Sequence, residues 1–143
     1  MRRREFLGTL SASLLASSLM GCSSEEATIG PVLKLPRGQI RGQIFNGVHR
    51  YLGIPYAEAP FGHNRFVAPV SRAPWDGIFE ADRYGLICPQ TGQGVGIDSF
   101  QEGEDCLNLN VWTPDPGAKG LPVMVWAHGG GQISGTGASS VYD

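Results

Sequence analysis

A run of five apolar residues, Val123 to Ala127, leads directly into His128 and three glycines, and this run limits the possible folds of the chain. A continuous apolar run of this length suits a central strand covered on both faces, as in a sheet flanked by helices. The sequence contains no convincing amphipathic helix to provide that cover. We therefore expect these residues to form the front part of a larger domain.

The three glycines that follow, Gly129 to Gly131, are suited to an oxyanion hole. Such a site offers backbone N–H groups to an oxygen that becomes negative when a carbonyl is attacked. Glycines let the backbone approach closely and adopt positive φ. A strand ending in His-Gly-Gly-Gly is typical of a lipase or esterase loop that donates part of this hole, with the nucleophile in a separate G-x-S-x-G motif. The 143 residues contain no G-x-S-x-G.

Other interpretations of this segment stay open. Because the chain has 21 glycines, three in a row are also consistent with a simple mobile turn. Gly135 to Ser140 comes near the G-x-G-x-x-G pattern of dinucleotide-binding loops, but it lacks the third glycine, the helix and the βαβ unit. His128 is a candidate general base, although a histidine directly before such a loop more often orients backbone.

The N-terminus has the pattern of an export signal. Three arginines, Arg2 to Arg4, precede a mildly apolar stretch over residues 6–20 that is too short and too rich in serine for a membrane span. Arg3, Arg4 and the residues after them resemble a twin-arginine signal, with the general secretory route as the alternative. We expect a signal peptide over residues 1–21.

Leu19-Met20-Gly21-Cys22 resembles the bacterial lipobox, which predicts that Cys22 carries a lipid and becomes the new N-terminus. An ordinary residue near a cleavage site is the alternative for Cys22. Removal of residues 1–21 moves the formal net charge from −2 to −4, which does not favour nucleic acid. We expect an exported protein, periplasmic or held in the cell envelope of a bacterium, that meets the membrane only through this signal or lipid.

Cysteine usage agrees with export. The chain has three cysteines, so lipidation of Cys22 would leave Cys88 and Cys106 as one pair in an oxidising compartment. Closing that loop would stabilise the fold by about 3 kcal/mol on the chain-entropy model. Pairing is a hypothesis, since sequence gives no geometry. The three histidines and these two cysteines lack metal-ligand spacing, and we expect neither a metal nor a cofactor.

The remaining residues form a turn-rich chain. Residues 22–31 are predicted to be a tether. Residues 39–45 and 48–52 flank Asn46-Gly47, the strongest short hairpin signal, and should form two antiparallel strands. Residues 55–105 are punctuated by Pro and Gly and should be mostly loop.

A further strand is predicted where Leu107, Leu109 and Val111 alternate with polar or aromatic residues. Pro114 should end it.

Six ordered blocks carry a family resemblance. They are Gly53-Ile54-Pro55-Tyr56-Ala57, Arg65-Phe66, Trp75-Asp76-Gly77, Cys88-Pro89-Gln90, Glu104 through Val111, and Pro122 through Gly131. Over residues 30–143 the sequence resembles the N-terminal part of the type-B carboxylesterase family, which includes the cholinesterases. The segment Glu-Asp-Cys-Leu and the glycine loop are its most specific parts.

The resemblance implies an α/β-hydrolase fold and a set of site residues. Gly130 and Gly131 would donate N–H groups to the oxyanion, with Gly129 supporting the turn. The family's catalytic Ser, acid and His would all lie beyond Asp143. The domain would occupy residues 32–143 and would be incomplete.

The resemblance also implies two structural pairings. The family's disulfide maps to Cys88 and Cys106, and its buried ion pair near that bridge maps to Arg65 and Glu104.

Departures from the family bear on the substrate. Cholinesterases carry a Trp within the disulfide loop that binds a quaternary ammonium by cation–π attraction, whereas residues 89–105 contain only Phe100 as an aromatic. A small carboxylic ester other than a choline ester is therefore expected. Gln132 stands where Phe is usual after the glycines, and Asn108 where Tyr is common.

Two hypotheses follow for the function. In the first, these residues are the leading part of a serine esterase that acts through an acyl-enzyme, and the 143-residue chain is inactive and poorly folded by itself. In the second, the chain is a lipid-tethered remnant of an esterase without chemistry.

Overall fold

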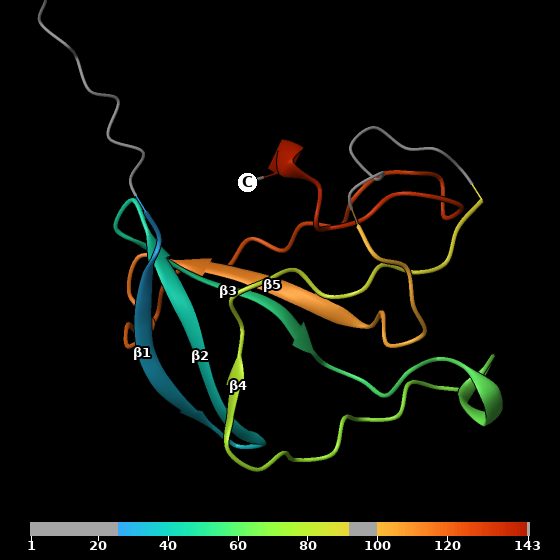
Figure 1. Cartoon of the computed structure of the whole chain (residues 1–143), viewed down its shortest axis with the longest axis horizontal. Coiled ribbons are helices and arrows are strands. Elements are labelled where there is room, and N and C mark those ends of the chain that lie inside the picture. Colours follow the sequence, from blue (N-terminus) through green and yellow to red (C-terminus); the bar gives the residue numbers. More distant parts are fainter. Residues whose placement is uncertain (1–25, 92–99, 143) are drawn as a thin grey trace, which may run out of the picture.

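The computed structural model describes residues 26–91 and 100–142, and it is built mainly from strands (Figure 1). The elements are β1 (Thr28–Leu35), β2 (Gly38–Phe45), β3 (Val48–Pro55), η1 (Gly62–Asn64), β4 (Ile78–Glu80), β5 (Asn108–Thr113) and η2 (Ser140–Tyr142), where η denotes a short 3₁₀ helix. None of the helices within these ranges has the length and apolar character needed to cross a bilayer. Cys22 and the rest of the predicted signal peptide lie outside the described residues.

The predicted hairpin is confirmed as β2 and β3. Phe45 pairs with Val48, and the two residues between them have positive φ, 50° at Asn46 and 75° at Gly47. Positive φ at both central positions is the property of the type I′ turn, whose twist matches that of the flanking strands. The Asn-Gly dipeptide therefore sets the register of the hairpin.

The expectation of a tether over residues 22–31 is wrong in its last part, because β1 begins at Thr28. This strand pairs antiparallel with β2 from Thr28 opposite Ile44 to Leu35 opposite Gly38. The register shifts between Ile29 and Val32, where Gly-Pro interrupts the strand. Proline has no N–H to donate to a ladder, and a bulge is a position where a strand tolerates it.

One edge of β2 is shared by two partners. Its last residues pair with β3 as far as Gln43 opposite Arg50, while the other edge of β3 pairs antiparallel with β5 from His49 to Pro55. The first residues of β2 pair in parallel with β4, from Gln39 opposite Ile78 to Arg41 opposite Glu80. The sheet thus has the order β1-β2-β3-β5, with β4 beside β2 (Figure 1).

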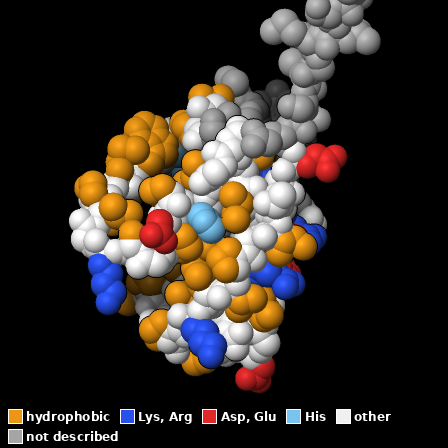
Figure 2. Space-filling model, turned by 90° about the vertical axis from the view of Figure 1, so that its left-hand side faces the viewer, with side chains coloured by type: hydrophobic (Ala, Val, Ile, Leu, Met, Phe, Trp, Pro, Cys, Tyr) orange, Lys and Arg blue, Asp and Glu red, His pale blue; other side chains and the backbone are white. Residues whose placement is uncertain are grey.

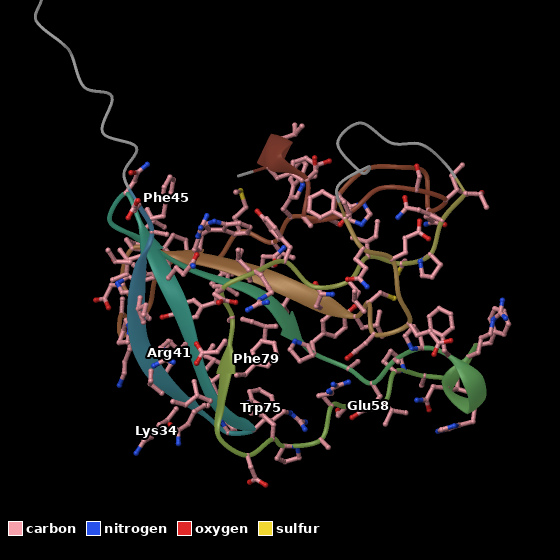
Figure 3. All side chains as sticks on the ribbon, in the orientation of Figure 1. Lys34, Arg41, Phe45, Glu58, Trp75 and Phe79 are labelled. Atoms are coloured by element: carbon pink, nitrogen blue, oxygen red, sulfur yellow. The ribbon has the colours of Figure 1, made fainter. Side chains whose placement is uncertain are left out.

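A small core lies where these strands meet. Ile40, Tyr51 and Ala81 are buried, and partly buried side chains pack against them, Trp75 and Phe79 among them. The rings of Trp75 and Phe79 are 6.0 Å apart and lie beside β4 (Figure 3). The indole N–H of Trp75 donates to the Gln39 carbonyl over 2.9 Å, which ties the loop before β4 to β2.

The strand predicted over residues 107–112 is confirmed as β5, which ends before Pro114. The strand predicted from Val123 to Ala127 is not formed: residues 121–129 make neither strand nor helix. The side chains of Val123, Met124 and Val125 are 84 to 89 % exposed. A strand forms only when its backbone hydrogen bonds to a neighbouring strand. A run of apolar residues shows that the segment favours burial, but it does not show which strand it would pair with.

Hydrophobic side chains are also exposed elsewhere. Seen from the side of β1, they cover much of the surface (Figure 2). On β1 itself Ile29 is 77 % exposed, and Val32 and Leu35 are exposed to a lesser degree. Exposed apolar side chains in this number are typical of a face that another layer or partner covers.

Candidate active site

The glycine loop forms a tight turn after the extended segment. Three consecutive residues have positive φ: 123° at Gly130, 62° at Gly131 and 64° at Gln132. The Gly130 carbonyl accepts hydrogen bonds from the N–H groups of Ile133 and Ser134, both over 3.2 Å. A Cβ at Gly130 would lie 2.6 Å from the Ser134 carbonyl carbon, so this turn requires glycine there.

The N–H groups of Gly130 and Gly131 are available to a ligand. Over the described ranges, neither group donates a backbone hydrogen bond to another residue. Both glycines are exposed, and a Cβ at Gly131 would meet no atom within 4 Å. Two adjacent unpaired N–H donors on an open turn are the arrangement that an oxyanion hole needs.

His128 and Gly129 form the entry to this turn. The Nδ1–H of His128 donates to the Gly129 carbonyl over 2.7 Å, so the ring contacts the backbone of the next residue. Gly135 packs against the same carbonyl and against the His128 ring, leaving no room for a side chain. The geometry therefore supports backbone orientation by His128, the alternative to general base catalysis.

Two amide side chains, which no local sequence pattern marks as anchors, hold the chain after the turn. Gln90 hydrogen bonds to both backbone groups of Gly135, and Asn110 on β5 hydrogen bonds to the Gly137 carbonyl. Their partners are 45 and 27 residues away in the sequence. Gln90 lies in one of the family blocks, and that membership is the only sequence signal pointing to it.

Cys88 and Cys106 are brought together as free thiols. Their Sγ atoms are 2.9 Å apart, longer than the roughly 2.05 Å of a disulfide bond. Burial, followed by the hydrogen bond with Cys88, raises the pKa of the Cys106 thiol to about 12. The covalent bond between these two residues stays a prediction.

The predicted ion pair between Arg65 and Glu104 is absent from the contacts among the described residues. The Arg65 guanidinium lies 4.8 Å from the centre of the neighbouring Phe66 ring. Arg72 instead donates to Asp105 from its two terminal guanidinium nitrogens, at 3.2 and 3.1 Å, and to Glu58 at 3.3 Å. Arg72 is thus the arginine that holds the segment leading into Cys106.

A shallow, open hollow of about 480 Å³ borders the glycine turn and is lined by Pro89, Gln90, Thr91, Glu102 and Ile133.

In the part of the chain that the structure describes, no three His, Cys, Asp or Glu side chains gather closely enough to hold a metal ion.

The chain is similar to known esterases. The para-nitrobenzyl esterase of Bacillus subtilis (strain 168) is 43% identical over 109 residues, covering 74% of this chain and 22% of that protein. An acylcarnitine hydrolase of Mus musculus is 35% identical over 156 aligned positions, covering 96% of this chain and 27% of that protein.

A solved structure titled PNB esterase superposes with a TM-score of 0.69 at 41% identity, over 78% of this chain and 23% of that one. The chain thus spans between a fifth and about a quarter of the length of these relatives. The fold is the N-terminal portion of an α/β-hydrolase carboxylesterase. Residues 29–143 match the family described as the carboxylesterase family, so the chain belongs to the carboxylesterase family.

Proposed function

We propose that these residues form the oxyanion-loop part of a serine carboxylesterase that hydrolyses carboxylic esters. The observation that carries the proposal is the turn at Gly130 and Gly131, whose two N–H groups are unpaired among the described residues. Its position after the apolar segment is the position of the esterase loop that supplies oxyanion donors. Membership of the carboxylesterase family supports the same reaction.

In the proposed mechanism a serine attacks the ester carbonyl while a histidine accepts its proton. The carbonyl oxygen becomes negative, and Gly130 and Gly131 donate N–H groups to it. Collapse of the tetrahedral intermediate expels the alcohol and leaves an acyl-enzyme, which water hydrolyses in the same way. Each oxyanion donor contributes about 3 kcal/mol, or roughly a hundredfold in rate. The serine and histidine belong to segments outside these 143 residues.

The proposed substrate is a small carboxylic ester without a quaternary ammonium. Phe100, the only aromatic residue between Pro89 and Asp105, packs edge-on against Tyr84 with ring centroids 6.0 Å apart. No Trp is present in that stretch to bind a choline group.

Activity-based labelling tests the proposal. The complete protein that carries these residues is treated with a fluorophosphonate, which bonds to an activated serine, and is assayed with p-nitrophenyl acetate. We expect covalent labelling outside residues 1–143 and ester turnover that labelling abolishes. The 143-residue chain alone should show neither. A complete protein without labelling or turnover would support the remnant hypothesis, and turnover by the 143-residue chain would refute our assignment of the nucleophile.

We also propose that the protein is exported, with a lipid on Cys22 and a disulfide between Cys88 and Cys106. The support is the N-terminal sequence pattern and the close approach of the two thiols. Cells fed a labelled fatty acid should label the native protein and leave the Cys22→Ser variant unlabelled. The unreduced purified protein should have no free thiol at positions 88 and 106, and two free thiols there would refute the disulfide.

A further inference from the structure

Gln90 pairs with the backbone of Gly135 at two points. Its Oε1 accepts from the Gly135 N–H over 2.7 Å, and its Nε2 donates to the Gly135 carbonyl over 3.2 Å. A side-chain amide that meets both backbone groups of one residue restrains the rotation of that peptide segment as well as its position. Gln90 thus acts on Gly135 as a neighbouring strand would.

The base of Gln90 is itself fixed. The Gln90 Nε2 also donates to the Cys88 carbonyl over 3.0 Å, which orients the amide. Just before it, Ile87 exchanges backbone hydrogen bonds with Gln101 and Gly103, each of 3.0 Å. The Gln90 amide therefore extends from a backbone segment that is held by hydrogen bonds. Through its own hydrogen bonds this amide holds Gly135 in place.

Asn110 provides a second attachment from a different element. It lies on β5, where its Oδ1 accepts from the Gly53 N–H of β3 over 2.9 Å, and its Nδ2 donates to the Gly137 carbonyl over 3.2 Å. The residues on either side of Gly137 are buried, Thr136 at 8 % exposure and Ala138 at 5 %. The segment that follows the turn is therefore held to the sheet.

The anchored segment is in direct contact with the turn that carries the free donors. Gly135 packs against the Gly129 carbonyl, and the two hydrogen bonds from Ile133 and Ser134 to Gly130 close the intervening residues into one tight unit. A shift of Gly135 would therefore move the N–H groups of Gly130 and Gly131, which donate no hydrogen bond to any of the described residues.

We propose that Gln90 and Asn110 are positioning residues that fix the direction of the oxyanion N–H groups. This inference rests on the proposed esterase function. Neither side chain touches the reacting atoms; each acts through the backbone that it holds. Since a displacement of about 1 Å at a catalytic group can cost about a hundredfold in rate, loss of the Gln90 attachment should lower kcat about 10- to 100-fold with KM within about threefold.

The decisive variant is Gln90→Glu in the complete protein. It keeps the size and one acceptor for the Gly135 N–H but places a carboxylate against the Gly135 carbonyl. Protonation of that carboxyl restores a donor, so activity relative to wild type should recover as pH falls from 8 to 5. The nearby Glu102, whose Oε1 accepts from the Gln90 N–H over 3.4 Å, raises the pKa of the introduced carboxyl further.

A matched control and a second position complete the design. Lys119→Gln, at an exposed residue outside these contacts, changes the net charge in the same direction as Gln90→Glu and should leave kcat, KM and the pH profile unchanged. Asn110→Asp keeps the acceptor for Gly53 and loses the donor to Gly137, so it should lower kcat in the same way. A trifluoromethyl ketone, which forms an oxyanion adduct, should lose affinity in proportion to kcat/KM in both positioning variants.

Hydrogen exchange tests this inference separately from the proposed function, because the measurement does not depend on esterase activity. The amide of Gly135 should exchange at least about tenfold faster in Gln90→Leu than in wild type, with the thermal midpoint of the complete protein little changed. If wild type has no esterase activity but exchange changes as expected, the attachment stands and the esterase proposal fails. Unchanged exchange at Gly135, or Gln90 variants with wild-type kcat, would overturn the inference.

Discussion

Gly130→Ala tests the oxyanion assignment most directly, because the Ser134 carbonyl occupies the space that a Cβ would need. The added carbon would lie 2.6 Å from the Ser134 carbonyl carbon and closer still to its oxygen, at a φ of 123°. Backbone strain of this kind costs about 1–3 kcal/mol, and opening the turn also breaks two hydrogen bonds worth about 1 kcal/mol each. The exposed turn should therefore rearrange locally.

A rearranged turn no longer directs its N–H groups at the substrate. Loss of one oxyanion donor costs about 10²–10³ in kcat, so we expect Gly130→Ala in the complete protein to hydrolyse p-nitrophenyl acetate about 100- to 1000-fold more slowly. KM should change by no more than about threefold, since the ground-state carbonyl depends little on these donors.

Two other glycines provide comparison. Gly120 lies outside the loop, and an alanine there would have to adopt a φ of 75° but would meet no atom within 4 Å. Gly120→Ala should therefore lower the free energy of unfolding by about 1–2 kcal/mol and leave kcat within twofold of wild type. Gly129→Ala meets no atom either and should cost less activity than Gly130→Ala. A folded Gly130→Ala enzyme with activity within threefold of wild type would refute the reasoning.

Two further predictions concern the segment that leads into Cys106. Arg72→Lys cannot keep the two-point contact with Asp105, and because these side chains are 30 and 44 % exposed the loss should be only about 0.5–1 kcal/mol in thermal unfolding. Arg83→Lys, at an 82 % exposed side chain, should cost nothing, and equal effects would contradict the role of Arg72. In the reduced protein, alkylation of Cys106 by iodoacetamide should rise about tenfold per pH unit from pH 8 to 10, because only the thiolate reacts and its pKa is raised to about 12. A plateau near pH 9 would show an ordinary thiol.

The sequence predicted the elements that a few neighbouring residues determine. The turn at Asn46 and Gly47 was readable because two adjacent residues specify a type I′ turn, and β5 was readable from its alternation. β4 has only three residues and pairs with β2 across 39 positions, so no pattern of its own marks it. β1 was obscured by the Gly-Pro bulge that interrupts it.

In the candidate site, too, only the residues with local determinants could be predicted from the sequence. The glycines at positions 130 and 131 were readable because positive φ favours that residue type, and at Gly130 the nearby Ser134 backbone also requires it. The attachments through Gln90 and Asn110 depend on chain segments that meet only after folding, and an amide side chain has no sequence context that reveals its partner. The apolar run from Val123 to Val125 predicted a buried strand, yet its side chains are exposed. Whether it forms a strand depends on partner strands that the local sequence does not identify.

The exposed run from Val123 to Val125 has a consequence for biosynthesis. In a domain of the relatives' length, these residues leave the ribosome when only about a quarter of the chain exists, and the remainder takes on the order of tens of seconds at roughly 5–20 residues per second. Throughout that interval an uncharged, β-prone segment with free backbone edges is open to pairing with other nascent chains. Chaperone binding to this segment, until its partner strands emerge, would therefore raise the yield of folded protein.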